Sequence, residues 1–370
     1  MSAGPHGRGI RVGLDATPLL GPRTGIGRYT GSLLAALAAG PREGDRLELV
    51  ATAFTLRGRL PGLTGVQVRS RPVPARALQL AWSRAEWPPV ELLIGRLDVF
   101  HATNFVLPPL RRARGVVTLH DLAFLHLADT VSAASARYRV LVPRSLRRAA
   151  VVLTPSEAVA SQVREAYATE LARSGAPVIA IPHGVSPGWA KASPPSETLR
   201  RRLGLPSEYV LFVGTLEPRK DLPTLLAAHR LVSGAPPLVL VGPPGWGAEV
   251  DLSGCVTPGF LDDDDLRPVV AGASVLVLPS RDEGFGLPVL EALAAGTPVV
   301  ASDLPALREV GGAHATYAPV GDVEAFAQAL RQVLHAPGDP LGARSHAAGF
   351  SWSRSAERHL DAYTLAQSCS

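Results

Sequence analysis

A chain of 370 residues is long enough for two domains, since a typical domain holds about 150 residues. Its 46% hydrophobic and 19% charged residues exclude a disordered protein, and no run reaches the roughly 20 apolar residues that a membrane-spanning helix needs. Residues 1–9 are polar and glycine-rich and lack the pattern of a secretory signal. The two cysteines, Cys255 and Cys369, show neither metal spacing nor a disulfide framework. We therefore expect an intracellular, cytoplasmic protein.

The net charge of +5 conceals two halves of opposite sign. Residues 1–188 hold 23 arginines against 12 acidic residues, a net charge of +11, whereas residues 189–370 have a net charge of −6. The aromatic content of 5% and the lack of a known reading motif argue against nucleic-acid binding despite the basic composition. Only two of the 37 basic residues are lysines, Lys191 and Lys220. A lysine in this chain therefore marks a position of interest.

Apolar, strand-like runs alternate with helical patterns along the whole chain. In the first half the runs are 10–14, 47–54, 66–68, 99–101, 116–120, 151–155 and 178–182. In the second half they are 209–214, 238–242, 274–279, 297–302 and 316–318, and helical patterns lie between them at 221–232, 287–295 and 323–334. Continuous Val, Ile and Leu runs bounded by Gly and Pro are typical of parallel strands that are buried on both faces.

This alternation predicts an α/β protein with two doubly wound, Rossmann-like domains. The first domain is expected at 1–187, the second at 188–350, and a closing helix at 351–370. Residues 185–206, rich in Ser and Pro, are predicted to form the linker. In such a protein a ligand is expected between the domains, at the carboxyl ends of the strands.

The most informative stretch is VLVLPSRDEGFGLPVLEALAAGTPVVASD, residues 275–303. Glu283 follows an apolar strand, glycines flank Phe285, and a helix is predicted to begin at Leu287. A helix N-terminus preceded by glycines presents backbone N–H groups and a positive dipole end to a phosphate. Glu291 lies on that helix, where the spacing alone is equally consistent with a solvated residue.

EGFGLPVLE, residues 283–291, resembles the Glu-x7-Glu motif of retaining glycosyltransferases with the two-domain GT-B architecture. FVGTLEPRKDLPTLLAA, residues 212–228, is similar to the donor-phosphate segment of the same group, glycosyltransferase family 4. Other matching blocks are GIGRYT at 25–30, TLHDLAFL at 118–125, LTPSEAV at 153–159, IPHGV at 181–185 and PGFLDDDDL at 258–266. Together they span nearly the whole chain. The resemblance implies a GT-B fold, in which two Rossmann-like domains face each other and a C-terminal helix crosses back to the first domain. It also implies that the first domain, residues 1–187, binds the acceptor and that the second, residues 188–350, binds the nucleotide-sugar donor.

The resemblance also implies roles around the donor. Arg219 and Lys220 match the cation pair that grips the diphosphate, where they neutralise the leaving group; a plain surface turn is the alternative. Glu283 matches a glutamate beside the transferred sugar, and Glu291 matches the carboxylate that holds the ribose hydroxyls. The backbone positions implied in donor binding are Gly214, Phe285, Gly286 and Leu287.

In the first half, His120 matches a histidine that lines the sugar pocket of this family, although a structural histidine is the alternative. Gly25, Gly27 and Arg28 match the loop that faces the donor phosphates and the acceptor, with a tight turn that binds nothing as the alternative. The next glycine, Gly31, comes one position too late for the dinucleotide fingerprint, which disfavours a nicotinamide enzyme.

Residues 262–265 contain Asp-x-Asp, the metal-binding signature of the other large glycosyltransferase architecture. Because the run follows Pro258-Gly259-Phe260 and precedes Leu266, the start of a helix is the favoured interpretation. No metal or other cofactor is predicted, since Arg219, Lys220 and helix N-termini can supply the positive charge.

The segment RYRVLVPRSLRR, residues 137–148, places arginines around Val140, Leu141 and Val142. Basic residues beside apolar ones on a helix predict contact with an anionic membrane surface, or with an anionic or lipid-linked acceptor. A solvated helix face, interrupted by Pro143, is the alternative.

The sequence therefore predicts a retaining glycosyltransferase that moves a hexose, such as glucose or mannose, from a UDP- or GDP-linked donor to an acceptor hydroxyl. The rival interpretations are a related GT-B enzyme, such as a phosphorylase or an epimerase, and a nucleotide-sugar-binding protein without catalysis. The base, the sugar and the acceptor stay open, because backbone groups are expected to bind the base.

Overall fold

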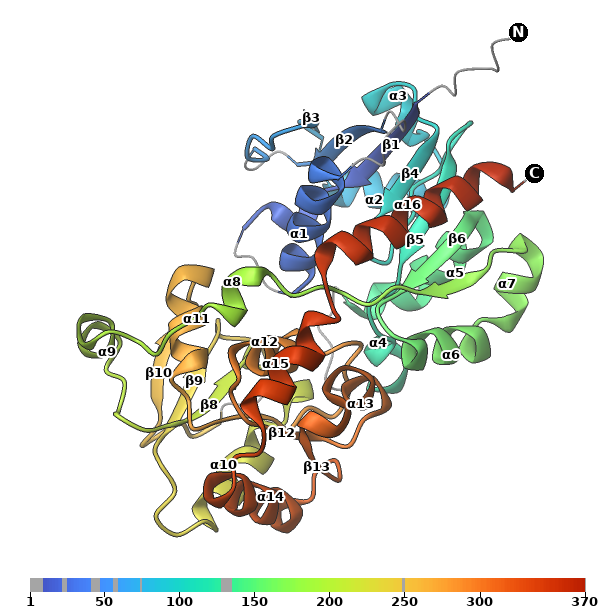
Figure 1. Cartoon of the computed structure of the whole chain (residues 1–370). Coiled ribbons are helices and arrows are strands. Elements are labelled where there is room, and N and C mark those ends of the chain that lie inside the picture. Colours follow the sequence, from blue (N-terminus) through green and yellow to red (C-terminus); the bar gives the residue numbers. More distant parts are fainter. Residues whose placement is uncertain are drawn as a thin grey trace, which may run out of the picture. The chain divides into compact units, whose positions relative to one another are not determined.

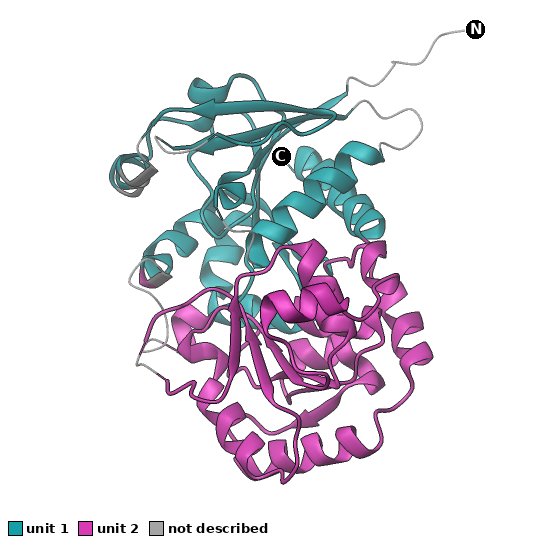
Figure 2. Cartoon of the chain, turned by 90° about the vertical axis from the view of Figure 1, so that its left-hand side faces the viewer, with its two compact units in different colours: residues 1–122, 137–182, 352–370 teal, residues 123–136, 183–351 magenta. Residues whose placement is uncertain are grey.

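The computed structural model describes residues 9–21, 25–40, 47–55, 59–73, 75–127, 135–247 and 250–369. The chain divides into two compact units, each built around its own parallel sheet (Figure 2). Unit 1 comprises residues 1–122, 137–182 and 352–370, and unit 2 comprises residues 123–136 and 183–351. The last helix thus returns to the first domain, as predicted.

Unit 1 contains a parallel sheet with the strand order β3-β2-β1-β4-β5-β6-β7. The strands are β1 (Ile10–Asp15), β2 (Leu47–Phe54), β3 (Val66–Arg71), β4 (Val99–Ala102), β5 (Arg114–Thr118), β6 (Ala149–Thr154) and β7 (Val178–Ala180). Strands β2 and β3 are added on one side of β1, and strands β4 to β7 are added in order on its other side. Doubly wound sheets bind ligands where this reversal occurs, at the carboxyl ends of the strands.

The helices of unit 1 cover both faces of this sheet. They are α1 (Gly25–Ala39), α2 (Ala75–Arg84), α3 (Val90–Ile94), α5 (Tyr138–Arg148), α6 (Glu157–Ala166), α7 (Ala168–Ser174) and α16 (Trp352–Ser368). Helix α16, red in Figure 1, packs beside α1, which is blue. Both helices bury apolar side chains in one core, among them Leu33 and Leu34 of α1 and Ala362 and Tyr363 of α16.

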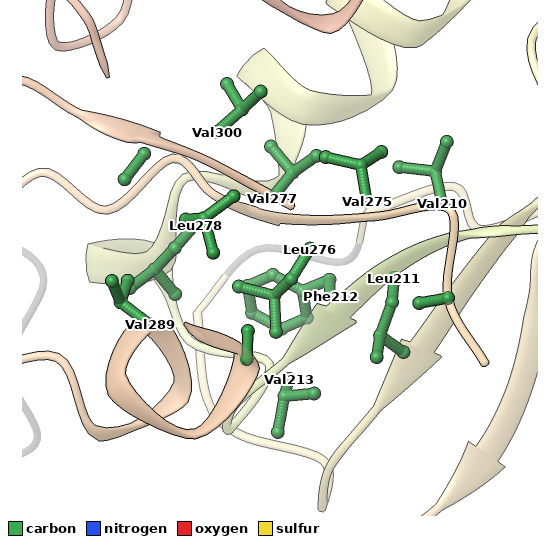
Figure 3. Packing of buried hydrophobic residues seen from close by; sticks show 14 of the residues in the cluster. Val210, Leu211, Phe212, Val213, Val275, Leu276, Val277, Leu278, Val289 and Val300 are labelled. Carbon is green, nitrogen blue, oxygen red and sulfur yellow. The ribbon is translucent and has the colours of Figure 1, made fainter. Parts of the chain in front are cut away.

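Unit 2 contains a parallel sheet with the order β10-β9-β8-β11-β12-β13. Its strands are β8 (Val210–Val213), β9 (Leu238–Val241), β10 (Val256–Gly259), β11 (Val275–Leu278), β12 (Val299–Ser302) and β13 (Thr316–Ala318). Every residue of β8 and β11 is buried, and Figure 3 shows their side chains packed together with Val289 of the helix that follows β11. Here the strand order reverses between β8 and β11.

The helices of unit 2 begin with α4 (Ala123–His126), which the contact pattern assigns to this unit. The others are α8 (Pro187–Ala190), α9 (Glu197–Leu203), α10 (Leu222–Arg230), α11 (Asp263–Ala271), α12 (Leu287–Ala295), α13 (Pro305–Gly311), α14 (Val323–His335) and α15 (Pro340–Ala348). Among the described residues, no helix is both long enough and apolar enough to span a membrane.

The expected linker, residues 185–206, folds as part of unit 2. It carries α8 and α9, and the Trp189 side chain is only 1% exposed, within the core of the unit. Ser196 accepts a hydrogen bond from the Leu199 amide and so caps α9. Serine and proline therefore begin short helices here, at positions where both residues are favoured.

Candidate active site

The loops that follow β8 and β11 meet at one edge of the unit 2 sheet. The two strands are parallel neighbours, with Val210 opposite Val275 and Leu211 opposite Leu276. Their carboxyl ends therefore lie side by side at the point where the strand order reverses, which is the usual ligand site of this architecture. The first loop carries residues 214–221 and the second carries residues 279–286.

Three side chains at this edge contact the carboxylate of Glu283. The Nζ atom of Lys220 lies 2.5 Å from Oε1 of Glu283, and Oγ of Ser280 donates to the same oxygen at 2.7 Å. The Lys220 and Glu283 side chains are only 10% and 8% exposed. One of the two lysines of the chain is thus paired with the first glutamate of the Glu-x7-Glu motif.

Arg219 completes this group from the same short 3-10 helix, Pro218–Lys220. Its Nη1 donates to the carbonyl oxygen of Asp282 at 2.8 Å and lies 3.4 Å from Oε2 of Glu283. Its Nε donates to Oε1 of Glu217 at 3.0 Å. The structure therefore brings together the three side chains that the sequence predicts around the diphosphate and the transferred sugar.

The charges around Glu283 determine its ionisation. Burial raises the pKa of this carboxyl group, but the positive charges of Lys220 and Arg219 and the hydrogen bonds from Lys220 and Ser280 together outweigh burial. The net result is a pKa below the ordinary glutamate value. Glu283 is therefore a carboxylate at neutral pH, which accepts hydrogen bonds from hydroxyl groups and attracts positive charge.

Two glycines allow the loops after β8 and β9 to pack backbone against backbone. Gly242 has φ +151°, and a Cβ atom on it would lie 1.9 Å from the carbonyl oxygen of Gly214. A Cβ atom on Gly245 would lie 2.3 Å from the carbonyl oxygen of Leu216. The loop after β9 therefore packs directly against the turn that leads from β8 to Arg219.

Helix α12 begins at the same edge. Gly286 is its N-cap, with φ +95°, and its carbonyl oxygen accepts from the amides of Val289 and Leu290. Pro288 has no N–H group, so the amides of Gly286 and Leu287 are the donors that the first turn can offer to a ligand. Donor binding by Gly286 and Leu287 stays a prediction.

The side chain of Phe285 does not belong to the ligand-facing surface. It is buried, and its ring centroid lies 4.7 Å from that of His183, within unit 2. Only the backbone of Phe285 can therefore serve the predicted role. Glu291, on α12, is 4% exposed, so the interpretation as a solvated helix residue is wrong. A buried carboxylate is costly unless hydrogen bonds or charges compensate it.

In unit 1, His120 lies two residues beyond the end of β5, not within the strand. Its ring is buried, and Nε2 lies 2.8 Å from the carbonyl oxygen of Thr103. Because a carbonyl oxygen only accepts, Nε2 carries the proton and Nδ1 is the acceptor of the neutral ring. Burial lowers the pKa of His120, which keeps the ring neutral.

The predicted glycine loop begins helix α1. Gly25 is its first residue and is exposed, whereas Gly27, two residues further on, is buried. Arg28 follows in the same turn. The role of this turn beside the donor and the acceptor stays a prediction.

The acidic run 262–265 starts a helix, as favoured from the sequence. Asp262 caps α11 by accepting from the Asp265 amide at 3.2 Å. Arg267 pairs with Asp263 and Asp264 at 3.3 and 3.4 Å. Within the described ranges, no group of three or more His, Cys, Asp or Glu is placed to hold a metal ion.

Sequence reasoning missed three side chains of this site. Ser280 and Glu217 hold Glu283 and Arg219, and Asp221 pairs with Arg281 at 3.1 Å. Each lies within a motif that was recognised, in the loop that follows β8 or β11. Polar residues at the ends of buried strands were the available signal.

Two family models match the chain in succession. "Glycosyl transferase 4-like domain" matches residues 24–170, and "Glycosyl transferases group 1" matches residues 207–336. The chain belongs to glycosyltransferase family 4.

Similar proteins extend along nearly all of this glycosyltransferase. O-antigen chain mannosyltransferase B of Escherichia coli is 29% identical over 96% of the chain and 100% of its own length. D-inositol 3-phosphate glycosyltransferase of Corynebacterium urealyticum is 27% identical over 88% of the chain and 84% of its own length.

Solved structures agree on the fold. Sucrose-phosphate synthase from Thermosynechococcus elongatus has a TM-score of 0.69 at 20% identity, covering 98% of the chain and 100% of that protein. HepE of Anabaena, in complex with UDP-glucose, has a TM-score of 0.67 at 17% identity, covering 96% of the chain and 99% of that protein. The glycosyltransferase therefore has the GT-B fold.

Proposed function

We propose that this glycosyltransferase is a retaining hexosyltransferase with a UDP- or GDP-linked donor. The proposal rests on one observation: Arg219 and Lys220 both form ion pairs with Glu283 at one edge of the unit 2 sheet. The bound UDP-glucose of HepE supports a nucleotide-sugar donor, and the name of the Escherichia coli relative supports a hexose of the mannose type.

The cation pair is proposed to bind the donor diphosphate. In the described arrangement Arg219 pairs with Glu217 at 2.8 Å and Lys220 with Glu283 at 2.5 Å, so these four groups carry no net charge. A diphosphate that binds beside them adds negative charge. Arg219 and Lys220 can both contact this diphosphate without leaving the site. The two cations stabilise the diphosphate more strongly as it departs, because its negative charge increases.

Transfer then forms one bond and breaks one bond at the anomeric carbon. The acceptor oxygen bonds to this carbon on the face from which the diphosphate oxygen leaves, and the hydroxyl proton passes to the departing phosphate. The configuration is therefore retained. Glu283, kept ionised, is proposed to bind sugar hydroxyls and to stabilise the positive charge that develops on the sugar. Nδ1 of His120 is proposed to accept a hydrogen bond from a sugar hydroxyl.

Glu291 is proposed to hold the ribose, and the amides of Gly286 and Leu287 to bind phosphate or sugar oxygens. Gly25 and Gly27 are proposed to lie against the donor and the acceptor. We propose turnover without a metal, because Arg219 and Lys220 supply the positive charge that a divalent ion supplies elsewhere. Undiminished activity in EDTA is the expected result.

Nucleotide release from a panel of UDP- and GDP-sugars tests the proposal. We expect release from one base and one hexose, and proton NMR of the product should show the anomeric configuration of the donor. Tight donor binding without release would favour a binding protein, and sugar phosphate formation without nucleotide would favour a phosphorylase. Inverted product would contradict the retaining mechanism.

Contact of unit 1 with a membrane stays a prediction. Helix α5 buries Leu141 and Val142 and leaves Val140 57% exposed beside exposed Arg147, so it offers little apolar surface to a bilayer. The excess of arginine in the first half still favours an anionic surface. Failure to co-sediment with anionic vesicles at low salt would argue against the contact.

A further inference from the structure

The side chain of Tyr29, on helix α1, packs against the ring of His120. Tyr29 belongs to the GIGRYT block at 25–30 and is only 1% exposed. The ring centroids of Tyr29 and His120 lie 5.0 Å apart, with the two ring planes at 78° to each other. Aromatic rings favour this edge-to-face geometry. Within unit 1, a residue of α1 thus contacts the histidine that follows β5.

A hydrogen bond alone does not fix the orientation of the His120 ring. Nε2 lies 2.8 Å from the carbonyl oxygen of Thr103, but the ring could still turn about the line that joins these two atoms. Two rings that stand nearly perpendicular to the imidazole restrict this turning, those of Tyr29 at 5.0 Å and Phe105 at 5.8 Å. The direction of Nδ1, the acceptor of the neutral ring, therefore depends on where these two rings lie.

The Tyr29 ring is anchored at its hydroxyl group. This oxygen lies 3.1 Å from Oγ1 of Thr118, at the end of β5, and 3.1 Å from Nε2 of His359, on α16. His359 is 1% exposed, and its Nδ1 lies 2.7 Å from the carbonyl oxygen of Ser355, so its own helix orients it. Hydrogen bonds are electrostatically stronger in such a buried environment than in water. The last helix thus holds the ring that packs on His120.

Tyr29 contacts α16 at two positions on one face of the helix. The ring centroid of Tyr29 lies 6.3 Å from that of Trp352 and 6.1 Å from that of His359. Trp352 is the first residue of α16, and His359 follows it by seven residues, which is about two helical turns. A shift of α16 would therefore move the Tyr29 ring, and with it the surface against which His120 packs.

We infer that Tyr29 is a positioning residue for His120, and that α16 holds Tyr29 in place through His359. The inference rests on the proposed function, in which Nδ1 of His120 accepts a hydrogen bond from a sugar hydroxyl. Tyr29 acts by fixing the direction of this acceptor atom. Misplacement of a reacting or binding group by about 1 Å can lower a rate about a hundredfold. A buried tyrosine that contacts only the histidine can therefore influence transfer.

Tyr363, on α16, provides a matched control. It is 0% exposed, and its hydroxyl group lies 2.8 Å from Nδ1 of His101. Among the residues that the structure describes, its ring packs on His101 and His359. Each of the two tyrosines thus fastens α16 through a buried hydroxyl group, but of the two it is Tyr29 that packs on His120. If Tyr29 only fastened the helix, its replacement would have the same consequences as replacement of Tyr363.

Steady-state kinetics of the full chain separates the two roles. Tyr29→Leu removes the ring and should lower kcat roughly tenfold, whereas Tyr29→Phe removes only the hydroxyl group and should lower kcat roughly threefold. The Kd for UDP or GDP should not change in either variant, because the proposed donor site lies in unit 2. Tyr363→Phe should keep the natural kcat. Thermal unfolding shows whether each variant is folded, and Tyr29→Phe carries the test if Tyr29→Leu does not fold.

A double-mutant cycle shows whether Tyr29 acts through His120. In a His120→Ala protein, Tyr29→Leu or Tyr29→Phe should lower kcat no further, because the ring that Tyr29 positions is absent. Natural kcat in the folded Tyr29 variants overturns the inference. A loss that is equally large with and without His120 also overturns it.

Side-chain NMR of protein labelled with ¹⁵N-histidine tests the position of His120 without turnover. The loss of signals in His120→Gln assigns them, and the natural chain should show a neutral ring with its proton on Nε2. Tyr29→Phe keeps an aromatic ring, so a changed His120 signal reports a displaced imidazole. We expect changed signals in Tyr29→Phe and natural signals in Tyr363→Phe. Natural His120 signals in both Tyr29→Phe and Tyr29→Leu overturn the inference.

The two proposals fail in different ways. If no nucleotide sugar is consumed while the His120 signals change in the Tyr29 variants alone, the transferase proposal fails and the positioning of His120 stands. If nucleotide sugars are consumed while kcat and the His120 signals of both Tyr29 variants stay natural, the transferase proposal stands and the positioning fails. Natural kcat in His120→Ala would overturn the catalytic consequence of the positioning.

Discussion

The hydroxyl group of Tyr29 lies 3.1 Å from Nε2 of His359, although 330 residues separate them in the sequence. The contact joins α1, the first helix of unit 1, to α16, the last. The chain of contacts continues from Tyr29 to Oγ1 of Thr118 at 3.1 Å, from Thr118 to Nε2 of His101 at 2.8 Å, and from Nδ1 of His101 to the Tyr363 hydroxyl at 2.8 Å. Buried polar groups thus connect α16 to the rest of unit 1 at two points.

One arrangement of protons satisfies this chain when both histidines are neutral. Nδ1 of His359 lies 2.7 Å from the carbonyl oxygen four residues earlier, which only accepts, so Nε2 must accept from Tyr29. Thr118 then donates to Tyr29. His101 donates to Thr118 through Nε2 and accepts from Tyr363 through Nδ1. An added proton on either ring removes an acceptor and breaks the chain.

The unfolding free energy should therefore decrease in mild acid. Burial lowers the pKa of His359 from 6.5 to about 4, and burial also lowers that of His101. Between these pH values the unfolded chain binds a proton that the folded chain does not, so stability is complete above pH 6.5 and falls toward pH 4. The loss from His359 alone is roughly 3 kcal/mol.

Urea unfolding at a series of pH values measures this effect. His359→Gln cannot take up a proton, so its stability should fall less between about pH 6.5 and about pH 4 than that of the natural chain. Other groups titrate in both proteins, so the difference between the two slopes is the informative quantity. Equal slopes would show that His359 does not link protonation to folding.

The interior strands of both sheets could be predicted because their sequences are continuous apolar runs. The expected range for the interior strand β2 matches the structure to the residue, and so does that for the edge strand β13. The edge strand β10, Val256–Gly259, was missed because it is only partly buried and contains a proline, so it lacks an apolar run. Burial on both faces creates a continuous apolar run, which the partial burial and the proline of β10 interrupt.

The sequence singled out the residues of the candidate site in unit 2 but not their contacts. Motifs identified Arg219, Lys220 and Glu283, yet their pairing spans 63 residues and depends on the register between β8 and β11. A single sequence carries no signal for a site assembled from separate loops.

Replacement of Lys220 should slow transfer, because it removes one of the two cations beside the departing diphosphate. We expect Lys220→Ala and Glu283→Ala each to lower kcat by more than about tenfold. The chain provides a matched control in its other lysine, the exposed Lys191 at the end of α8. Nucleotide release under saturating donor checks the prediction, and Lys191→Ala should behave like the natural protein. Near-normal turnover in Lys220→Ala would contradict the assigned role.

Glu291→Gln should weaken donor binding more than it slows the chemical step. A neutral amide keeps the size of the side chain but loses the charge that strengthens hydrogen bonds to ribose hydroxyls, so the Kd for the nucleotide should rise about tenfold. Isothermal titration with UDP and GDP measures the change. The matched control is Glu309→Gln, an exposed glutamate on α13. A similar Kd for Glu291→Gln and Glu309→Gln would exclude ribose contact by Glu291.

Gly242→Ala should disturb both the fold and the donor site of unit 2. The new methyl group would lie 1.9 Å from the carbonyl oxygen of Gly214, so the loop after β8 must move. Gly254→Ala separates this clash from backbone strain, because Gly254 also has positive φ, +83°, but has no atom within 4 Å of its Cβ position. Strain alone costs roughly 1 kcal/mol, so thermal unfolding should show a small loss for Gly254→Ala and a larger loss for Gly242→Ala. Nucleotide binding should weaken only in Gly242→Ala, and equal losses in the two variants would mean that the contact with Gly214 does not hold the loop.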